Sequence, residues 1–217
     1  TETDTQAAES PVQAEWRPLD SLERRVAGVL VEEAKTTPWA YPLTLNAICT
    51  AANQKSNRDP VMQVEPDDVQ EALERLRASG AVVEVQGDGR VPKYRHRLYE
   101  WLGVDKTELS VMAELLLRGP QTEGELRSRA SRMNRIDDLP ALRQLLESLE
   151  AKRLVVPLTP PGRGHMITHG LYLPEELETV QSSYAGGAPS ASARSPAAST
   201  PSMSTSSSSP LDDSLRG

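Results

Sequence analysis

The fold of this 217-residue chain is decided by a stretch that occurs twice. Residues 72–85 read ALERLRASGAVVEV, and residues 145–158 read LLESLEAKRLVVPL. In each copy, apolar residues at helical spacing are followed by a short valine-rich run that is typical of a strand. The second copy begins 73 residues after the first, at position 145 rather than 72. The sequence therefore predicts that one structural unit is present twice.

The first unit extends on both sides of residues 72–85. Asp20, with Glu23 three residues later, forms a capping box for a first helix, and Gly80 ends the third one. The run Gln-Gly-Asp-Gly at residues 86–89 is typical of a tight hairpin turn. The expected elements are helices that begin at Asp20, near Thr44 and at Pro66, and strands over residues 82–85 and 91–99. Three helices closed by a hairpin correspond to the winged-helix plan.

The second unit repeats this order. The expected elements are a helix over residues 105–118, helices that begin at Thr122 and near Pro140, and strands over residues 154–158 and 165–173. Thr122 and Glu125 form a capping box for the middle helix. The predicted fold class is thus mainly α with small β-hairpins (α+β), in the form of two tandem winged-helix domains of helix-turn-helix type. We place the first domain at residues 19–102 and the second at residues 103–175.

Large apolar side chains are almost confined to residues 19–173. Outside this region the chain consists largely of Ser, Ala, Pro, Gly and Thr. Such segments bury too little apolar surface to offset the conformational entropy that is lost on ordering. The sequence therefore predicts a disordered N-terminal segment at residues 1–18 and a disordered Ser/Ala/Pro-rich tail at residues 176–217.

Composition limits the classes of protein to which the chain can belong. Residues 20–100 contain 13 acidic and 11 basic side chains and residues 101–175 contain 10 of each, so much of the net charge of −7 lies outside the folded region. This balance neither supports nor excludes a basic face. The lone cysteine, Cys49, suits a reducing compartment, and no apolar window predicts a membrane span or a signal peptide. We expect a cytoplasmic protein.

A polar stretch in the first unit resembles a known family. The run of residues 41–47, the stretch NQKSNRDPVM at residues 53–62 and the run VQEAL at residues 69–73 are similar to the YceH family of bacterial proteins. The similarity covers residues 19–173 and implies two winged-helix domains, a cytoplasmic location and no established activity. Members of that family often end in a Leu- and Glu-rich helix, whereas this chain becomes Ser/Ala/Pro-rich from Gln181. The sequence therefore does not predict self-association through such a helix.

The polar loop supplies the first set of candidate binding residues. Amide and guanidinium donors of this kind suit phosphate oxygens or a carboxylate-bearing partner. The alternative is that the same side chains cap helix ends and hold a long loop through its backbone. The candidates are Asn53, Gln54, Lys55, Asn57 and Arg58.

The third helix of a DNA-binding winged helix usually enters the major groove. Here its expected outer face carries Asp67, Asp68, Glu71 and Glu74 beside Arg75 and Arg77. The corresponding helix of the second unit exposes Glu147 and Glu150 beside Arg143. Carboxylates near phosphates oppose the counterion release that normally drives such binding. The sequence therefore favours a solvated face for both helices.

Basic residues gather elsewhere. Alternation along the returning strand places Lys93, Arg95 and Arg97 on one face as a basic ridge. A second basic group in the second unit comprises Arg127, Arg129 and Arg132, with Arg135 nearby. Both groups are candidate nucleic-acid or partner contacts, and the alternative is that they form exposed, individually weak salt bridges.

No catalytic or metal-binding pattern is found. His165 and His169 are four residues apart in a strand or turn, where this spacing does not converge on one ion, and Cys49 lies on an apolar helix face. Trp16, Trp39 and Trp101 are expected to fill gaps at the edges of the units or between them. We expect no cofactor, no small-molecule substrate and no enzymatic activity. Of three hypotheses, an enzyme has no positive support in the sequence. The other two are a nucleic-acid-binding or regulatory protein that contacts duplex DNA, and a protein-interaction scaffold that grips a partner chain or a second copy as a homodimer.

Overall fold

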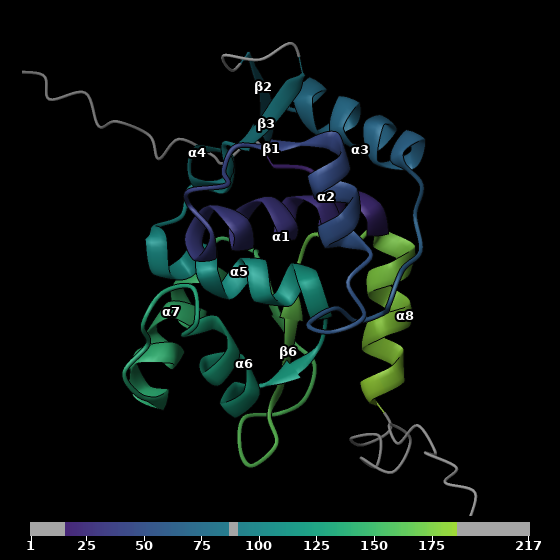
Figure 1. Ribbon diagram of the computed structural model, residues 1–217. Coiled ribbons are helices and arrows are strands. Elements are labelled where there is room, and N and C mark those ends of the chain that lie inside the picture. Colours follow the sequence, from purple (N-terminus) through teal and green to yellow (C-terminus); the bar gives the residue numbers. More distant parts are fainter. Residues whose placement is uncertain (1–15, 87–90, 186–217) are drawn as a thin grey trace, which may run out of the picture.

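The computed structural model describes residues 16–86 and 91–185 (Figure 1). Within these ranges it contains eight helices and two small antiparallel sheets, each of three strands. The predicted mixture of helices with small hairpins is confirmed at this level. The predictions of disorder for residues 1–15 and 186–217, and the hairpin turn at residues 87–90, lie outside the described residues.

The first half follows the predicted order and adds two elements. Its elements are α1 (Ser21–Thr36), β1 (Leu43–Thr44), α2 (Leu45–Ala52), α3 (Pro66–Ala78), β2 (Val82–Gln86), β3 (Pro92–His96) and α4 (Leu98–Leu102). The sheet has the order β1-β3-β2. The returning strand ends at His96 rather than at residue 99, because Leu98 begins the short helix α4. Gly103 ends α4 with a positive φ of 65°, which glycine adopts without strain.

The second half repeats this arrangement. Its elements are α5 (Lys106–Arg118), β4 (Gln121–Thr122), α6 (Glu123–Ala130), α7 (Leu139–Ala151), β5 (Val155–Pro157) and β6 (Met166–His169). The sheet has the order β4-β6-β5, so its last strand is central, as in the first half. Both halves therefore share the order helix, strand, helix, helix, strand, strand, and the predicted internal repeat is visible in three dimensions.

The capping boxes predicted at two helix starts are present. The backbone N–H of Glu23 donates to the Asp20 carboxylate at 2.8 Å, and the Asp20 N–H donates to Glu23 Oε2 at 2.9 Å. Thr122 and Glu125 form the same reciprocal pair at 3.3 and 3.1 Å. Each box satisfies N–H groups that the first helical turn leaves without a partner.

An eighth helix, α8 (Pro174–Ala185), follows the second half. The sequence places the start of a disordered tail at residue 176, but the described chain stays helical up to Ala185. The Glu176 carboxylate explains the difference, because it accepts the Leu173 N–H at 3.1 Å and pairs with Arg24 of α1 at 2.7 Å. A contact from a distant part of the chain therefore fixes the start of this helix.

The two halves pack through α1 and α5, which lie side by side in the middle of the molecule (Figure 1). Gly28 of α1 permits this approach, since a Cβ atom there would lie only 2.8 Å from Cγ of Leu117. Buried side chains of both halves form one continuous apolar cluster. The helices of residues 16–86 and 91–185 include none that is both long and apolar enough to cross a membrane.

Candidate nucleic-acid interface

The polar loop between α2 and α3 is held by its own side chains. The Asn53 amide donates to the carbonyl of Val64 at 2.8 Å and accepts the Val64 N–H at 2.8 Å. Asn57 adopts a positive φ of 60°, and its side-chain oxygen accepts a hydrogen bond from Arg118 of the second half. Both residues therefore serve loop architecture. Gln54 and Lys55 are exposed.

Arg58 is too deeply buried to bind a partner. Its side chain is 0% exposed, and its guanidinium pairs with Glu32 of α1 at 2.6 Å. Two further N–H groups donate to the carbonyls of Ala51 at 3.1 Å and Asn57 at 2.9 Å. A guanidinium so enclosed holds the loop to α1 and cannot reach a partner.

Arg58 belongs to a buried ion network between the halves. Glu114 of α5, which is 0% exposed, pairs with Arg118 at 3.1 Å and with Arg132 at 3.5 Å, and Arg132 also reaches Glu32 at 3.4 Å. Burial raises the pKa of Glu114, and the nearby arginines act in the opposite direction. The network joins α1, the polar loop, α5 and the segment after α6. Sequence reasoning missed it, although Glu114 interrupts an otherwise apolar run.

The basic side chains of the second half contact other residues of the protein itself. Arg127 donates to the carbonyls of Ile136 and Asp137 at 3.3 and 3.2 Å, which holds the segment between α6 and α7. Arg129 donates to the Gln121 amide oxygen at 2.7 Å. Arg132 belongs to the network above. These three candidates therefore have partners within the protein, although backbone carbonyls and buried carboxylates take the place of the exposed salt bridges that the alternative interpretation expects.

The three cations on and after β3 differ from these arginines. Lys93, Arg95 and Arg97, here called the β3 ridge, make no side-chain hydrogen bond or ion pair with any described residue. Tyr94 between them is buried, so the predicted alternation is present. Across the sheet, Lys93 is opposite Thr44 and Val85, and Arg95 is opposite Val83. The outer face of this sheet thus combines unpaired positive charge with small apolar groups.

His96 fixes the end of β3 from the inner side. Its backbone N–H donates to the Tyr41 hydroxyl at 2.7 Å, and its ring lies between those of Tyr41 and Tyr99, at centroid distances of 6.0 and 5.6 Å. Burial, with a contribution from Lys35, lowers the pKa of His96 to about 4. The imidazole is therefore neutral at pH 7 and holds Arg95 and Arg97 in place without adding charge.

This pKa predicts an acid-sensitive end of the first sheet. Because the folded-state pKa of about 4 lies below the unfolded value of about 6.5, protonation favours the unfolded chain. Stability is fully present above pH 6.5 and falls as the pH decreases toward 4, by about 1–2 kcal/mol at pH 5. Urea unfolding at pH 8 and pH 5 measures this loss. His96→Gln should flatten the pH dependence, and an unchanged slope would contradict the assignment to His96.

The third helices carry the predicted negative faces. Asp67, Asp68, Glu71 and Glu74 of α3 are exposed. Arg75 pairs with Asp20 at 2.9 Å, and Arg77 pairs with Glu84 of β2 at 2.9 Å. In the second half, Arg143 of α7 pairs with Glu123 at 2.8 Å. These three arginines are thus paired with carboxylates of the protein, while the carboxylates of α3 are exposed to solvent.

The remaining polar candidates are buried. His169 stacks on Tyr172 at a centroid distance of 3.9 Å, and burial lowers its pKa well below the ordinary value. Cys49 is a core residue whose thiol donates to the carbonyl of Val64 at 3.4 Å. Among the residues that the structure describes, no cluster of three His, Cys, Asp or Glu side chains could hold a metal ion.

Comparison with known proteins identifies relatives of most of the chain. Residues 19–163 match the family described as "Protein of unknown function, DUF480". A UPF0502 protein of Rhodopirellula baltica is 58% identical over 160 residues, which cover 74% of this chain and 68% of that protein. A UPF0502 protein of Koribacter versatilis is 41% identical over 177 residues, covering 78% and 83% respectively.

Other relatives are matched over a smaller share of their length. A UPF0502 protein of Geobacter sulfurreducens is 50% identical over 143 residues, which cover 66% of this chain and 63% of that protein. For the UPF0502 protein of Geotalea daltonii, the match spans 62% of that protein. The expected similarity to a family of bacterial proteins is confirmed, whereas YceH as the name of that family stays a prediction. The chain belongs to the DUF480 family, whose relatives carry the name UPF0502.

Proposed function

We propose that this chain is a non-enzymatic protein with two tandem winged-helix domains, which binds nucleic acid through the β3 ridge of the first domain. The order helix, strand, helix, helix, strand, strand in both halves supports the winged-helix assignment, with the domains at residues 19–102 and 103–175. We also propose that the protein acts in the cytoplasm and uses no cofactor. Regulation of transcription is one role that such binding would serve.

One observation carries the proposal. Arg58, Arg127, Arg129 and Arg132 all contact carboxylates, amide oxygens or carbonyls of the protein itself, whereas Lys93, Arg95 and Arg97 do so with none of the described residues. Unpaired cations on one strand and directly after its end can meet successive phosphates of a nucleic-acid backbone. A face that is already neutralised gains less from such contacts, because its ion pairs must first be broken.

The acidic third helices determine how a nucleic acid would be approached. The carboxylates of α3 would lie against phosphates if this helix entered the major groove, which is unfavourable. We therefore propose contact through the outer face of the sheet, with the phosphate backbone as the main ligand. Binding of this kind depends weakly on base sequence and strongly on salt.

Titration of the full chain with a labelled duplex at two salt concentrations tests this proposal. Three phosphate contacts predict that log K falls with log salt with a slope of about −2 to −3. Arg95→Glu with Arg97→Glu should weaken binding by about tenfold or more, since two contacts become repulsive. Arg135→Glu with Arg163→Glu, which changes the charge equally at exposed sites, is the matched control. Salt-insensitive binding, or equal losses in both variants, would contradict the proposal.

A second candidate function is supported by the face of α3. Its exposed carboxylates, Asp67, Asp68, Glu71 and Glu74, suit a basic protein surface rather than a nucleic acid. The chain would then be a scaffold that grips a partner or a second copy of itself. Light scattering of the purified chain separates these forms, because a homodimer doubles the mass in the absence of any partner. Absence of nucleic-acid binding in the titration above would favour this candidate.

A further inference from the structure

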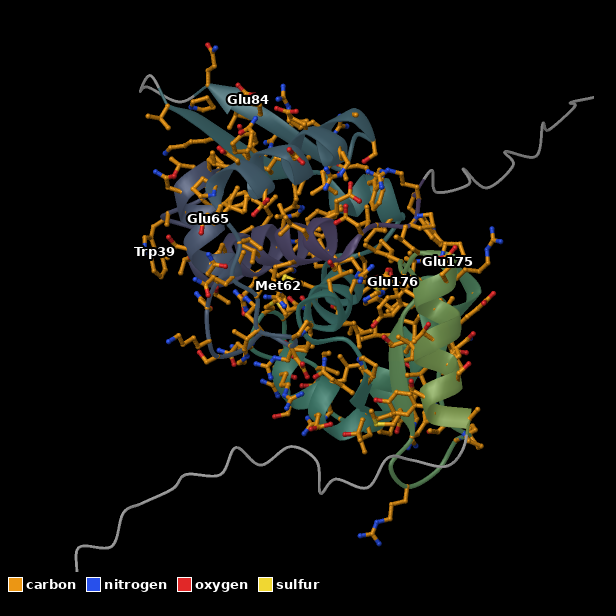
Figure 2. All side chains as sticks on the ribbon, turned by 90° about the vertical axis from the view of Figure 1, so that its right-hand side faces the viewer. Trp39, Met62, Glu65, Glu84, Glu175 and Glu176 are labelled. Carbon is orange, nitrogen blue, oxygen red and sulfur yellow. The ribbon has the colours of Figure 1, made fainter. Side chains whose placement is uncertain are left out.

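Two large apolar side chains of the first half lie on the surface instead of in the core. Trp39, which was expected to fill a gap, is 82% exposed and stands at the edge of the molecule (Figure 2). Val91, directly before β3, is 60% exposed and forms part of the wall of a pocket of about 320 Å³ between α2, α3 and β3. This pocket, here called the α2–α3 pocket, is also lined by Leu45, Asn46, Gln70, Pro92 and Tyr94. Its volume is at the lower end of the range of ligand pockets and suits one large apolar side chain.

Polar side chains in the lining of the pocket are either fixed or available. The Gln70 amide oxygen accepts the hydroxyl of the buried Tyr94 at 3.3 Å, and the Gln70 amide nitrogen donates to Glu74 at 3.0 Å. These bonds connect the lining of the pocket to the outer face of α3. The side chain of Asn46 is exposed and makes no hydrogen bond with any described residue. Its amide can therefore bind the backbone of a chain that enters the pocket.

A negatively charged stripe of α3 adjoins the pocket. Asp67 and Glu74 are three residues before and four residues after Gln70, so the three side chains share one face of the helix. Both carboxylates are exposed, and neither forms an ion pair with a residue that the structure describes. The arginines of α3 pair with carboxylates of other residues. A partner that fills the pocket therefore meets two unpaired carboxylates, here called the α3 stripe.

The second half carries an ion pair at the equivalent positions. The threonine caps of α2 and α6 correspond to each other, and α3 and α7 both have 13 residues. Leu45 and Gln70 therefore correspond to Glu123 and Arg143, which pair at 2.8 Å. The same arrangement of helices and strands thus holds an ion pair across these positions in one half and an apolar pocket in the other. The fold itself does not require the pocket.

We infer that the α2–α3 pocket binds a segment of a partner protein that carries a large apolar side chain with a basic side chain close to it. The apolar side chain fills the pocket, the Asn46 amide binds the backbone of the segment, and the cation pairs with the α3 stripe. A nucleic acid is disfavoured at this site, because the same carboxylates repel phosphates. The inference rests on the second candidate function. It is independent of nucleic-acid binding, since the strand residues of the β3 ridge lie on the opposite face of β3 from Tyr94.

Charge disfavours two other occupants of the pocket. Residues 1–15 contain four acidic residues and no Lys or Arg. Residues 186–217 contain two arginines and two aspartates, so they carry no excess of positive charge. In a twofold dimer built on this surface, the α3 stripe of one copy would lie near that of the other, and like charges repel. A basic segment of a different protein is the complementary partner.

Selection from a random dodecapeptide library on the immobilised full chain tests the inference. Enriched peptides should share a large apolar residue with a Lys or Arg within four positions. A synthetic peptide of the enriched sequence is then titrated against variants of the chain. Leu45→Glu with Gln70→Arg introduces the ion pair of the second half, and it should weaken peptide binding by about tenfold or more because the pocket is closed. Since the second half folds with this pair, the variant should keep the fold, and circular dichroism checks this.

The contribution of charge has its own matched control. Asp67→Lys with Glu74→Lys should weaken peptide binding by about tenfold, and the loss should shrink as salt is raised. Glu147→Lys with Glu150→Lys makes the same change of charge at exposed positions of α7 and should have little effect. Equal losses in both variants would contradict a specific role of the α3 stripe.

The remaining outcomes distinguish the occupants and the proposals. No enrichment, or enriched peptides without basic residues, would overturn the inference. A dimer that the Leu45→Glu, Gln70→Arg variant dissociates would replace the partner by a second copy, and tighter peptide binding after removal of residues 186–217 would replace it by the tail of the chain. Arg95→Glu with Arg97→Glu should not weaken peptide binding. If the duplex binds through the β3 ridge and no peptide is selected, only the inference about the pocket fails.

Discussion

Replacement of Arg58 by alanine is expected to lower the free energy of unfolding by about 3–5 kcal/mol. The side chains of Arg58 and Glu32 are 0% and 8% exposed and meet at 2.6 Å. Removal of the guanidinium leaves the Glu32 carboxylate buried with only Arg132, at 3.4 Å, as an opposite charge. It also leaves the carbonyl of Ala51 without its donor. The cost is that of an uncompensated buried charge, and urea unfolding at pH 7 measures it.

A control and a double variant separate this explanation from a general effect of losing an arginine. Arg135 pairs with Asp137 at 2.6 Å, but the two side chains are 88% and 69% exposed, so Arg135→Ala should cost less than about 1 kcal/mol. Arg58→Met with Glu32→Leu removes both charges and should be less destabilising than Arg58→Ala alone. A double variant that is as unstable as the sum of the two single ones would contradict the charge-pair explanation.

The parts of the fold that sequence patterns predicted are those encoded locally. The capping box of Asp20 and Glu23 and the repeated run at residues 72–85 and 145–158 depend on neighbours within a few residues. The strands β1 and β4 were missed because two residues are too short to show any alternation. The helix α8 was missed because its start depends on Arg24, which is 152 positions away in the chain from Glu176.

The same distinction holds for the candidate site. The sequence shows where the basic residues are. Whether one of them can bind a partner depends on whether the fold places a carboxylate or carbonyl of the protein beside it. Arg58 and Arg97 look alike in the sequence, yet the first meets Glu32 from α1 and the second has no described partner. Alternation along β3 correctly predicted that Lys93 and Arg95 share a face opposite the buried Tyr94, whereas Arg97 lies beyond the end of the strand, at the start of α4. The exposure of Trp39 gave no signal in the sequence, because an aromatic residue between prolines is compatible with either a core or a surface position.

The packing of α1 against α5 makes Gly28 the second position with a large expected effect. A Cβ atom at residue 28 would lie 2.8 Å from Cγ and 2.9 Å from Cδ2 of Leu117, and Leu117 is fully buried. Gly28→Leu should lower the free energy of unfolding by about 2–3 kcal/mol, because the added side chain must displace α5 or force strained rotamers. The higher helix propensity of leucine offsets less than about 1 kcal/mol of this. Thermal or urea unfolding measures the change.

Gly124 of α6 provides the matched control, because a Cβ atom there meets nothing within 4 Å. Gly124→Ala should therefore stabilise the chain, by up to about 1 kcal/mol, through helix propensity alone. If the space occupied by Leu117 is the cause at Gly28, then Gly28→Ala combined with Leu117→Ala should be more stable than the sum of the two single effects predicts. Simple additivity would mean that Gly28 is not limited by this contact. The helix α1 contacts the polar loop, the buried ion network and α5. A displacement of α1 at Gly28 should therefore also change the surroundings of Arg58 and Glu114, so the stability of both halves depends on this small residue.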